Sequence, residues 1–198
     1  MIIYIQHRNE GPGATHPKRE INVHACERKA YERLAQHGLC DRGLVPKFYG
    51  VIENMDIDLW QPLLVQFLND WWCDYPPNAI IMEYIPGMQR LWLDNYSPKR
   101  AEGFLHQIKE IHKAGILHDD PHPRNMMVFG DDPDGVMWID FDRAQVDDGV
   151  FYTSETLQEM LDEEDILVAE VGPMIVSLSN CYRCFRSWFS FLTGFLGK

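Results

Sequence analysis

The sequence of 198 residues predicts an α+β fold, because segments with strand character and segments with helical spacing both occur along it. Residues 2–6, 48–52 and 79–85 are short runs of β-branched, aromatic and other apolar residues, which favours strands. Residues 23–37 and 98–115 carry apolar residues three and four positions apart, which is typical of helices with one buried face.

In the first half of the chain, a loop with two glycines and two prolines (residues 8–19) follows the first predicted strand. Asn22 can cap the helix of residues 23–37, and Gly38 is a plausible stop. Residues 54–78 leave two interpretations open. Residues 59–72 could form a buried helix, but Pro62 and the Trp71-Trp72 pair argue against a regular one.

In the second half, the strand of residues 79–85 ends at the Pro86-Gly87 turn, and Pro98 opens a helix that closes at Gly115. Two strands, residues 126–129 and 136–139, flank Asp-Asp-Pro-Asp-Gly, a sequence with the turn chemistry of a hairpin. An acidic helix is expected from Ser154 to about Ala169, with a mainly solvated face, and a separate apolar stretch, residues 174–196, completes the chain.

The net charge of -12 is unevenly distributed, since residues 119–165 hold 15 of the 30 carboxylates and two basic residues, Arg124 and Arg143. Such a field repels a phosphate backbone, so we expect no nucleic-acid partner. It is compatible with ATP, because a divalent cation held by carboxylates reverses the local sign. The composition therefore favours a metal-dependent function.

The five cysteines are odd in number and scattered, which suits a reducing compartment. Cys181 and Cys184 form a lone Cys-x-x-Cys that we interpret as two unpaired thiols. The start of the chain lacks the features of a signal peptide, and no apolar run reaches about 18 residues, the length of a membrane span. A cytoplasmic location is expected.

Three polar residues around the hairpin match the needs of phosphate transfer from ATP. That reaction requires a residue that orients or deprotonates the acceptor hydroxyl, and oxygen ligands that hold Mg²⁺ against the phosphates. Asp120 can act on the hydroxyl, while Asn125 and Asp140 offer the amide and carboxylate oxygens that Mg²⁺ prefers. The hairpin is expected to bring residues 118–125 and 140–142 to neighbouring ends.

The pattern His118-x-Asp120-x-x-x-x-Asn125, followed by a hairpin and Asp140-Phe141, resembles the catalytic loop and metal-binding segment of protein kinases and of aminoglycoside phosphotransferase-like enzymes. The resemblance implies that Asp120 is the catalytic base, that Asn125 and Asp140 bind the metal, and that His118 braces the loop. Asp142, in place of the usual glycine, could be a further metal ligand. His122 stands where many protein kinases carry a lysine, and it is either an exposed loop residue or a group near the γ-phosphate.

The same resemblance extends upstream. Residues 80–87 are similar to the segment that joins the two lobes of kinases, where the backbone of Glu83, Tyr84 and Ile85 would bond the adenine of ATP. Glu27 is the first candidate for the helix glutamate of the small lobe, and Glu32 is the second. The resemblance thus implies a two-lobed kinase-like fold, with a partial N-terminal lobe (residues 1–85) and a mainly helical C-terminal lobe (residues 86–198). The residue pattern of these motifs is similar to that of fungal kinase-domain-like proteins.

The chain departs from the family before Glu27. Kinases place a glycine-rich loop and a strand lysine there, but about twenty residues precede this helix, so we expect a truncated N-terminal lobe. Tyr4 lies near the expected lysine position, and Lys18 or Arg19 could substitute for that lysine. No Ala-Pro-Glu segment follows Asp142. The prediction is an ATP- and Mg²⁺-dependent phosphotransferase with an unidentified protein or small-molecule acceptor. The alternative is a weak or inactive pseudokinase that acts as a binding protein.

Two other interpretations fit less well. A hydrolase metal site with His118 and His122 on one helix face is disfavoured, because Pro121 and Pro123 break a helix. A phosphatase with Asp140-x-Asp142 as its nucleophile motif would ordinarily carry the motif early in the domain and follow it with threonine. The apolar tail, residues 181–198, either packs on the larger lobe or lies on a membrane surface or a partner.

Overall fold

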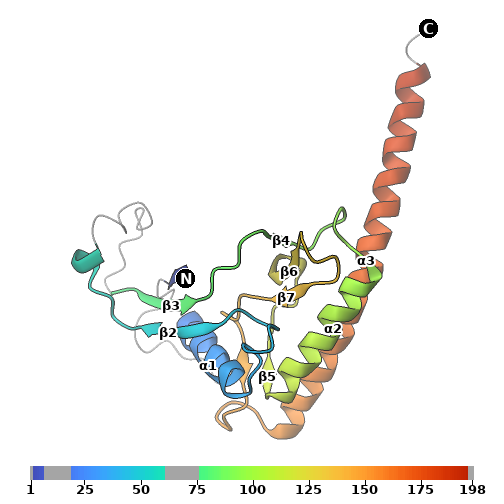
Figure 1. The fold of residues 1–198 in the computed structure, drawn as a ribbon. Coiled ribbons are helices and arrows are strands. Elements are labelled where there is room, and N and C mark those ends of the chain that lie inside the picture. Colours follow the sequence, from blue (N-terminus) through green and yellow to red (C-terminus); the bar gives the residue numbers. More distant parts are fainter. Residues whose placement is uncertain (1, 7–18, 61–75, 196–198) are drawn as a thin grey trace.

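The computed structural model describes residues 2–6, 19–60 and 76–195. Within these residues the chain is a mixed α+β protein, with α-helices packed beside small antiparallel sheets (Figure 1). The α+β class expected from the sequence is therefore confirmed. The predicted helix of residues 59–72 falls almost entirely outside the described residues, and the part that is described is the short 3₁₀-helix Ile57–Trp60.

An antiparallel sheet of three strands forms one side of the described structure. Strand β3 (Asn78–Met82) lies in the centre, between β1 (Ile2–Gln6) and β2 (Phe48–Ile52). The register pairs Tyr4 with Ile80, and a shift between Phe48 and Gly50 interrupts the pairing of β2. The predicted strand of residues 79–85 thus ends early, at Met82. The chain leaves the sheet there, and the Glu83 N–H donates to the Lys47 carbonyl (2.8 Å).

Helix α1 (Val23–Gln36) lies against this sheet and matches the predicted helix. The Asn22 side chain accepts a hydrogen bond from the Ala25 N–H (3.0 Å), as a cap does. The buried face of the helix is mostly apolar and includes Cys26, Ala30, Tyr31 and Leu34. It also carries two polar residues, His24 and Glu27. The presence of Glu27 on this face brings a carboxylate into the interior.

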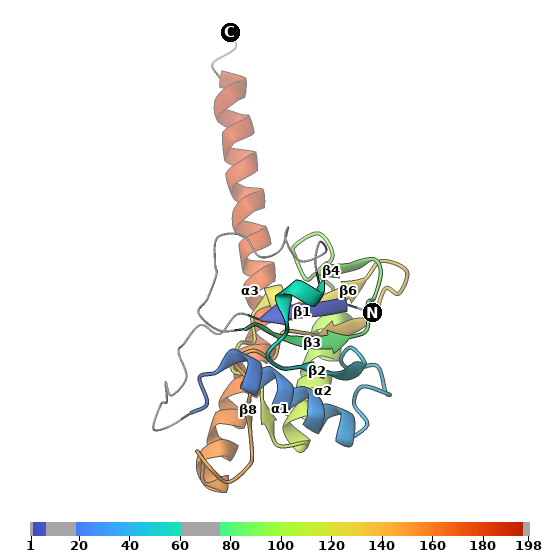
Figure 2. The ribbon, with the colours of Figure 1, turned by 90° about the vertical axis from the view of Figure 1, so that its left-hand side faces the viewer.

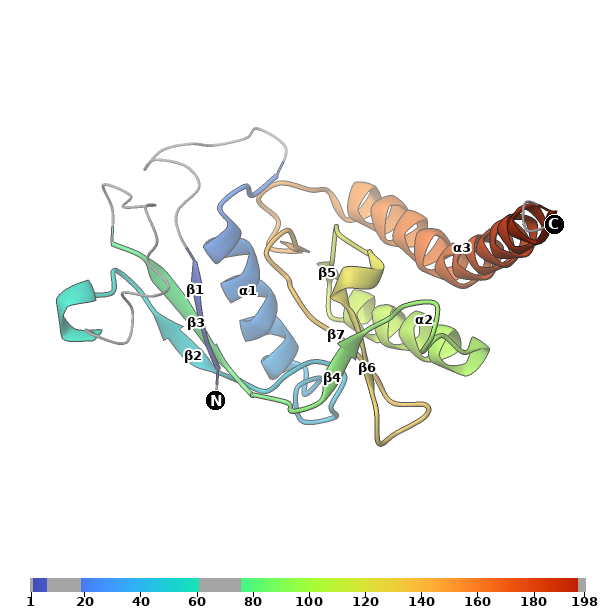
Figure 3. The ribbon, with the colours of Figure 1, turned by 90° about the horizontal axis from the view of Figure 1, so that it is seen from above.

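The second half of the chain contains a sheet in the order β4 (Met88–Arg90), β6 (Met126–Phe129) and β7 (Val136–Trp138). Strands β6 and β7 pair antiparallel, which confirms the predicted hairpin. A pair of two-residue strands, β5 (Ile116–Leu117) and β8 (Gln145–Val146), lies close by. Residues 118–125 connect β5 to β6 and residues 139–144 connect β7 to β8, so the two connections are brought together (Figure 3).

Helices α2 (Pro98–Lys113) and α3 (Ser154–Phe195) pack against each other, and α3 then extends beyond the rest of the chain (Figures 1 and 2). The expectation of an acidic helix and a separate apolar stretch is wrong, because one helix runs through Pro173. Buried Val168, Val171 and Ile175 flank the proline and hold both parts of the helix in the core, which offsets the lost backbone hydrogen bond. The side chains of the tail from residue 178 lie outside the described part.

A chain of aromatic rings crosses the core from α1 to α2. Tyr31 of α1 meets Phe141 edge to face (5.4 Å between ring centroids), and Phe104 of α2 meets Trp138 in the same way (5.6 Å). The His118 ring lies between them, 4.7 Å from Phe141 and 5.0 Å from Trp138. These rings are almost fully buried, so both connections between the strands are fixed to one core.

In the part of the chain that the structure describes, no helix combines the length and the apolar character needed to cross a membrane.

Truncation of the ring that links α1 to His118 should destabilise the whole fold. We expect Phe141→Ala to lower the free energy of unfolding by about 3–5 kcal/mol, as is usual for a buried phenylalanine. Trp92→Ala is the matched control, since Trp92 is a large aromatic residue that is 63% exposed, and it should change stability by less than about 1 kcal/mol. Urea unfolding followed by circular dichroism measures both; equal effects of the two substitutions would contradict this description of the core.

Candidate functional site

The segment of residues 118–125, here called the polar loop, is bonded directly to residues 139–142. The Ile139 N–H donates to the Asn125 carbonyl (3.1 Å), and His118 Nε2 lies 3.1 Å from the Ile139 carbonyl. The hairpin of β6 and β7 brings these segments together as the sequence predicted. Asp120, Asn125, Asp140 and Asp142 therefore belong to one neighbourhood.

The Asp120 carboxylate is buried and tightly held. One terminal nitrogen of Arg124 donates to both oxygens (2.7 and 2.6 Å), and the Asn125 Nδ2 donates to Oδ2 (2.8 Å). Burial alone would raise the pKa of Asp120, but the hydrogen bonds from Arg124 and Asn125 and the charge of Arg124 hold it below its ordinary value. Asp120 is therefore an ionised carboxylate at neutral pH.

Asn125 is positioned by the same contacts. Its Nδ2 also donates to the Asp120 carbonyl (3.0 Å), so both amide hydrogens are directed at Asp120. The amide oxygen of a side chain lies on the opposite side from its nitrogen, and in Asn125 it is turned away from Asp120. An amide oxygen and a carboxylate thus come from one short, internally bonded turn.

Three carboxylates form a second group next to the polar loop. Burial, then the charge of Asp142, raises the pKa of Asp140, and burial also raises the pKa of Asp142. Burial and the charges of Asp140 and Asp142 raise the pKa of Glu27 to about 8. Among the described residues, no hydrogen bond or ion pair reaches the side chain of Asp140 or Asp142. The charges of Asp140 and Asp142 thus oppose each other, and a cation placed between them would relieve that repulsion.

Two aspartates of the site have left-handed backbone conformations, with φ of 59° at Asp119 and 67° at Asp140. Aspartate tolerates this region better than most residues, but the conformation still costs energy and persists where the surroundings hold it. At Asp119 the surroundings are an ion pair with Arg19 (2.7 Å) and a backbone hydrogen bond to Glu164 (2.7 Å). At Asp140 the following residue, Phe141, is fixed in the core.

Glu164 of α3 braces the polar loop, and sequence reasoning missed it. Its carboxylate accepts the N–H groups of His118 (3.0 Å) and Asp119 (2.7 Å), and His112 Nε2 lies 2.8 Å away. The expectation of a solvated acidic face is wrong at this residue, which is 3% exposed. A signal was available, since Leu157, Leu161, Glu164 and Val168 share one helical stripe.

His118 and His122 have different roles in the structure. Complete burial lowers the pKa of His118, and its Nε2 is committed to the Ile139 carbonyl, so it is a neutral residue that positions the loop. The side chain of His122 is 60% exposed, yet its Nδ1 lies 2.6 Å from Asp120 Oδ1. His122 is thus an exposed loop residue that also contacts Asp120, and a position near the γ-phosphate stays a prediction.

The remaining predicted residues are placed unequally. Glu27 is buried, whereas Glu32 lies at the surface within 4.0 Å of Arg28, so Glu27 is the better candidate for the helix glutamate. The Glu83 N–H is already donated to the Lys47 carbonyl and its carboxylate accepts the Lys47 N–H (3.2 Å). Of the backbone groups predicted to bond adenine, the Glu83 carbonyl and those of Tyr84 and Ile85 remain, and the Tyr84 side chain is exposed. The side chains of Tyr4 and Lys18 lie outside the described residues.

No group of three or more His, Cys, Asp or Glu side chains in the described part of the chain is arranged to hold a metal ion alone. An Mg²⁺ ion that is shared with phosphate oxygens needs fewer protein ligands than that.

Comparison with models of known protein families finds no match for this chain, and comparison with curated proteins finds no similar sequence.

Loss of the Glu164 brace should destabilise the polar loop and the fold. Glu164→Ala leaves the buried N–H of His118 and the partly buried N–H of Asp119 without an acceptor. A buried group left unpaired costs about 1–3 kcal/mol. Glu163→Ala is the matched control, because it removes the same side chain from an exposed position one residue earlier. We expect Glu164→Ala to lower the unfolding midpoint in urea and Glu163→Ala to leave it almost unchanged. Equal midpoints of the two variants would show that Glu164 does not brace the loop.

Glu27 should make stability depend on pH. Its pKa is raised from 4.5 to about 8 in the folded protein, so the folded state keeps a proton that the unfolded chain has lost. The contribution of Glu27 to stability is therefore fully present below pH 4.5 and is lost as the pH rises to about 8. Glu27→Gln removes this loss, and we expect its advantage over the wild type to grow by up to about 3 kcal/mol from pH 5 to pH 8. Urea unfolding at several pH values tests this, and an advantage that is constant or shrinks would contradict it.

Proposed function

We propose that the chain is a kinase-like phosphotransferase that uses ATP and Mg²⁺. Asp120 orients the acceptor hydroxyl, while Asn125 and Asp140, with Asp142, hold the metal. One observation carries the proposal: a buried, ionised Asp120 is fixed by Asn125 on a loop bonded to the segment that bears Asp140 and Asp142. The α+β architecture and the resemblance of residues 118–142 support a two-lobed kinase-like fold, in which residues 83–85 would connect the lobes.

The donor set fits Mg²⁺. The Asn125 amide oxygen and the carboxylates of Asp140 and Asp142 are hard oxygen ligands, the kind Mg²⁺ requires. The raised pKa values of Asp140 and Asp142 indicate that the protein alone stabilises their negative charges poorly. This is expected of carboxylates that bind a cation. A bound Mg²⁺ supplies charge neutralisation for the phosphate oxygens of the nucleotide.

The contacts of Asp120 define what it can do. A carboxylate whose pKa is held low is a weak base, so Asp120 acts chiefly by accepting a hydrogen bond from the hydroxyl. The hydroxyl would take the place of the exposed His122 side chain at Oδ1. This suits phosphate transfer, in which positioning and electrostatic stabilisation contribute most of the rate. The Arg124 side chain, 52% exposed, can stabilise negative charge at the mouth of the site.

A nucleotide-binding protein with weak catalysis is the second candidate. One observation favours it: Arg19, which could replace the strand lysine of kinases, is paired with Asp119 (2.7 Å) instead. A missing electrostatic contact of this kind typically lowers rates by factors on the order of 10²–10³. We therefore expect turnover that is slow for a kinase.

Nucleotide binding and turnover should separate by residue. We expect Mg-ATP to raise the melting temperature of the wild type, and Asp140→Asn to weaken Mg-ATP binding about tenfold or more, because it removes a charged metal ligand. Asp120→Asn should retain binding and lose about 10²-fold or more in ATP turnover. Asp131→Asn, at an exposed loop position, is the matched control and should change neither.

Three results would decide against parts of this proposal. No melting shift at millimolar Mg-ATP would exclude the nucleotide. A shift without turnover in the wild type would favour the binding protein. Unchanged turnover in Asp120→Asn would remove Asp120 from its role.

A further inference from the structure

A cavity of about 310 Å³ borders the candidate site, and the function proposed above assigns no ligand to it. Its lining comes from Arg19, Glu20 and Ile21, from Val23 and Cys26 of α1, and from Asp142 and Arg143. It shares Asp142 with the proposed metal ligands, but none of residues 83–85, Asn125 or Asp140 lines it. The cavity is therefore adjacent to the expected nucleotide site and distinct from it.

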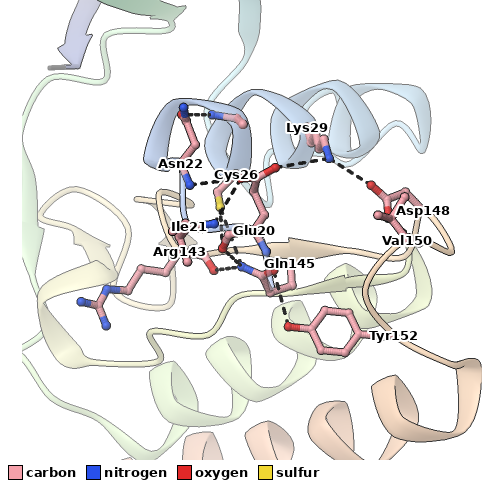
Figure 4. A network of polar contacts seen from close by, with 11 residues as sticks. Glu20, Ile21, Asn22, Cys26, Lys29, Arg143, Gln145, Asp148, Val150 and Tyr152 are labelled. Atoms are coloured by element: carbon pink, nitrogen blue, oxygen red, sulfur yellow. Dashed lines mark hydrogen bonds and ion pairs between the residues drawn. The ribbon is translucent and has the colours of Figure 1, made fainter. Parts of the chain in front are cut away.

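A hydrogen-bond network around buried Gln145 holds the two sides of the cavity together (Figure 4). The Gln145 Nε2 donates to the carbonyls of Glu20 (3.1 Å) and Arg143 (2.9 Å), and its Oε1 accepts the Glu20 N–H (2.9 Å). The segment before α1 is thus tied to the segment after Asp142. The walls are preorganised, which lowers the cost of binding a ligand between them.

Two guanidinium groups line this cavity. Arg19 is paired with Asp119 through one terminal nitrogen, and its Nε is buried without a hydrogen-bond partner in the described structure. The Arg143 side chain is directed away from the Gln145 network in Figure 4, and no described residue forms an ion pair with it. Both side chains keep N–H groups that can be donated to a ligand.

The acidic residues of the lining differ in how strongly they oppose an anion. The Glu20 carboxylate accepts the N–H groups of Ile21 and Asn22 (3.1 Å each) and lies 3.8 Å from Lys29 Nζ, so its charge is balanced locally. Asp142 is balanced by Arg143 and, in the proposed function, by the metal. Arg143 forms no ion pair with a described residue, so its N–H groups, unlike those of Arg19, all stay available to a ligand.

We propose that this cavity binds an oxyanion, a phosphate or carboxylate group, of a small acceptor molecule. The inference rests on the proposed function, and it deepens that function by assigning the acceptor a chemical class. Guanidinium groups bind planar carboxylates and phosphates through paired hydrogen bonds, and two of them in one preorganised cavity favour such a group over a neutral one. Asp142 lines the cavity and Arg19 is paired with Asp119, the residue before Asp120, so an acceptor anchored here would lie beside the polar loop.

Calorimetric titration with inorganic phosphate and, separately, acetate tests the cavity without nucleotide, in buffer that contains EDTA. We expect millimolar binding of at least one anion, weakened about tenfold by Arg143→Gln through loss of a charge-assisted contact. Val23→Phe should block binding by filling the cavity without a change of charge. Asp142→Asn should strengthen binding several-fold, because it removes a negative charge from the lining. Arg90→Gln, an exposed arginine outside the cavity, is the matched control and should have no effect.

Several outcomes would overturn the inference. One is that neither anion binds, and another is that Arg143→Gln and Arg90→Gln weaken anion binding equally. A third is anion binding that neither Arg143→Gln nor Val23→Phe changes. Weakening of Mg-ATP binding by Arg143→Gln to the same extent as anion binding would also overturn it, since the cavity would then serve the nucleotide. The two proposals fail separately, because anion binding in EDTA does not depend on Mg-ATP, and Mg-ATP binding does not require the cavity.

Discussion

The placement of His118 is the constraint on which the rest of the site depends. Its ring is enclosed between Trp138 and Phe141, and its Nε2 is bonded to the Ile139 carbonyl, so one side chain joins the polar loop to the segment of Asp140 and Asp142. Its backbone N–H is held from the other side by Glu164. Because a buried neutral histidine fits this environment and a charged one does not, the contact is stable at neutral pH. It adds to the bond between the Ile139 N–H and the Asn125 carbonyl and to the β6–β7 hairpin, which hold the same two segments together.

The pKa values of the carboxylates in this site are shifted in opposite directions. The pKa of Asp120 is held low in spite of burial, because Arg124 and Asn125 donate hydrogen bonds to the charged form. Burial and mutual repulsion raise the pKa values of Asp140, Asp142 and Glu27, whose charges are compensated less. In this site the protein stabilises the charge of one carboxylate, while a cation would stabilise the charges of its neighbours. Carboxylates in such different environments can have different chemical roles. This division agrees with one residue that orients a hydroxyl and others that hold Mg²⁺.

Local sequence signals predicted much of the fold, and partners distant in the sequence decided the rest. The Asn22 cap, the helical spacing of α1 and the turn residues between β6 and β7 act within a few residues, and each prediction based on them is confirmed. The position of Asp120 beside Asn125 follows from their spacing in a short loop. Glu164 was missed because the N–H groups that it accepts lie 45 and 46 residues away in the sequence. Its place on an apolar helical stripe indicates that it faces inward, but no local pattern identifies its donors. The continuity of α3 through Pro173 likewise depends on its packing against α2.

The central claim is that Asn125 and Asp140 hold a metal against a nucleotide beside Asp120. Crystals grown with Mn²⁺ in place of Mg²⁺ and a non-hydrolysable ATP analogue test it most directly, since Mn²⁺ is located by its anomalous scattering. The account predicts an anomalous peak within about 2.0–2.4 Å of the Asn125 amide oxygen and an Asp140 oxygen, together with phosphate oxygens of the analogue. A peak bound elsewhere on the chain, or a nucleotide that makes no contact with this pair of residues, would contradict it.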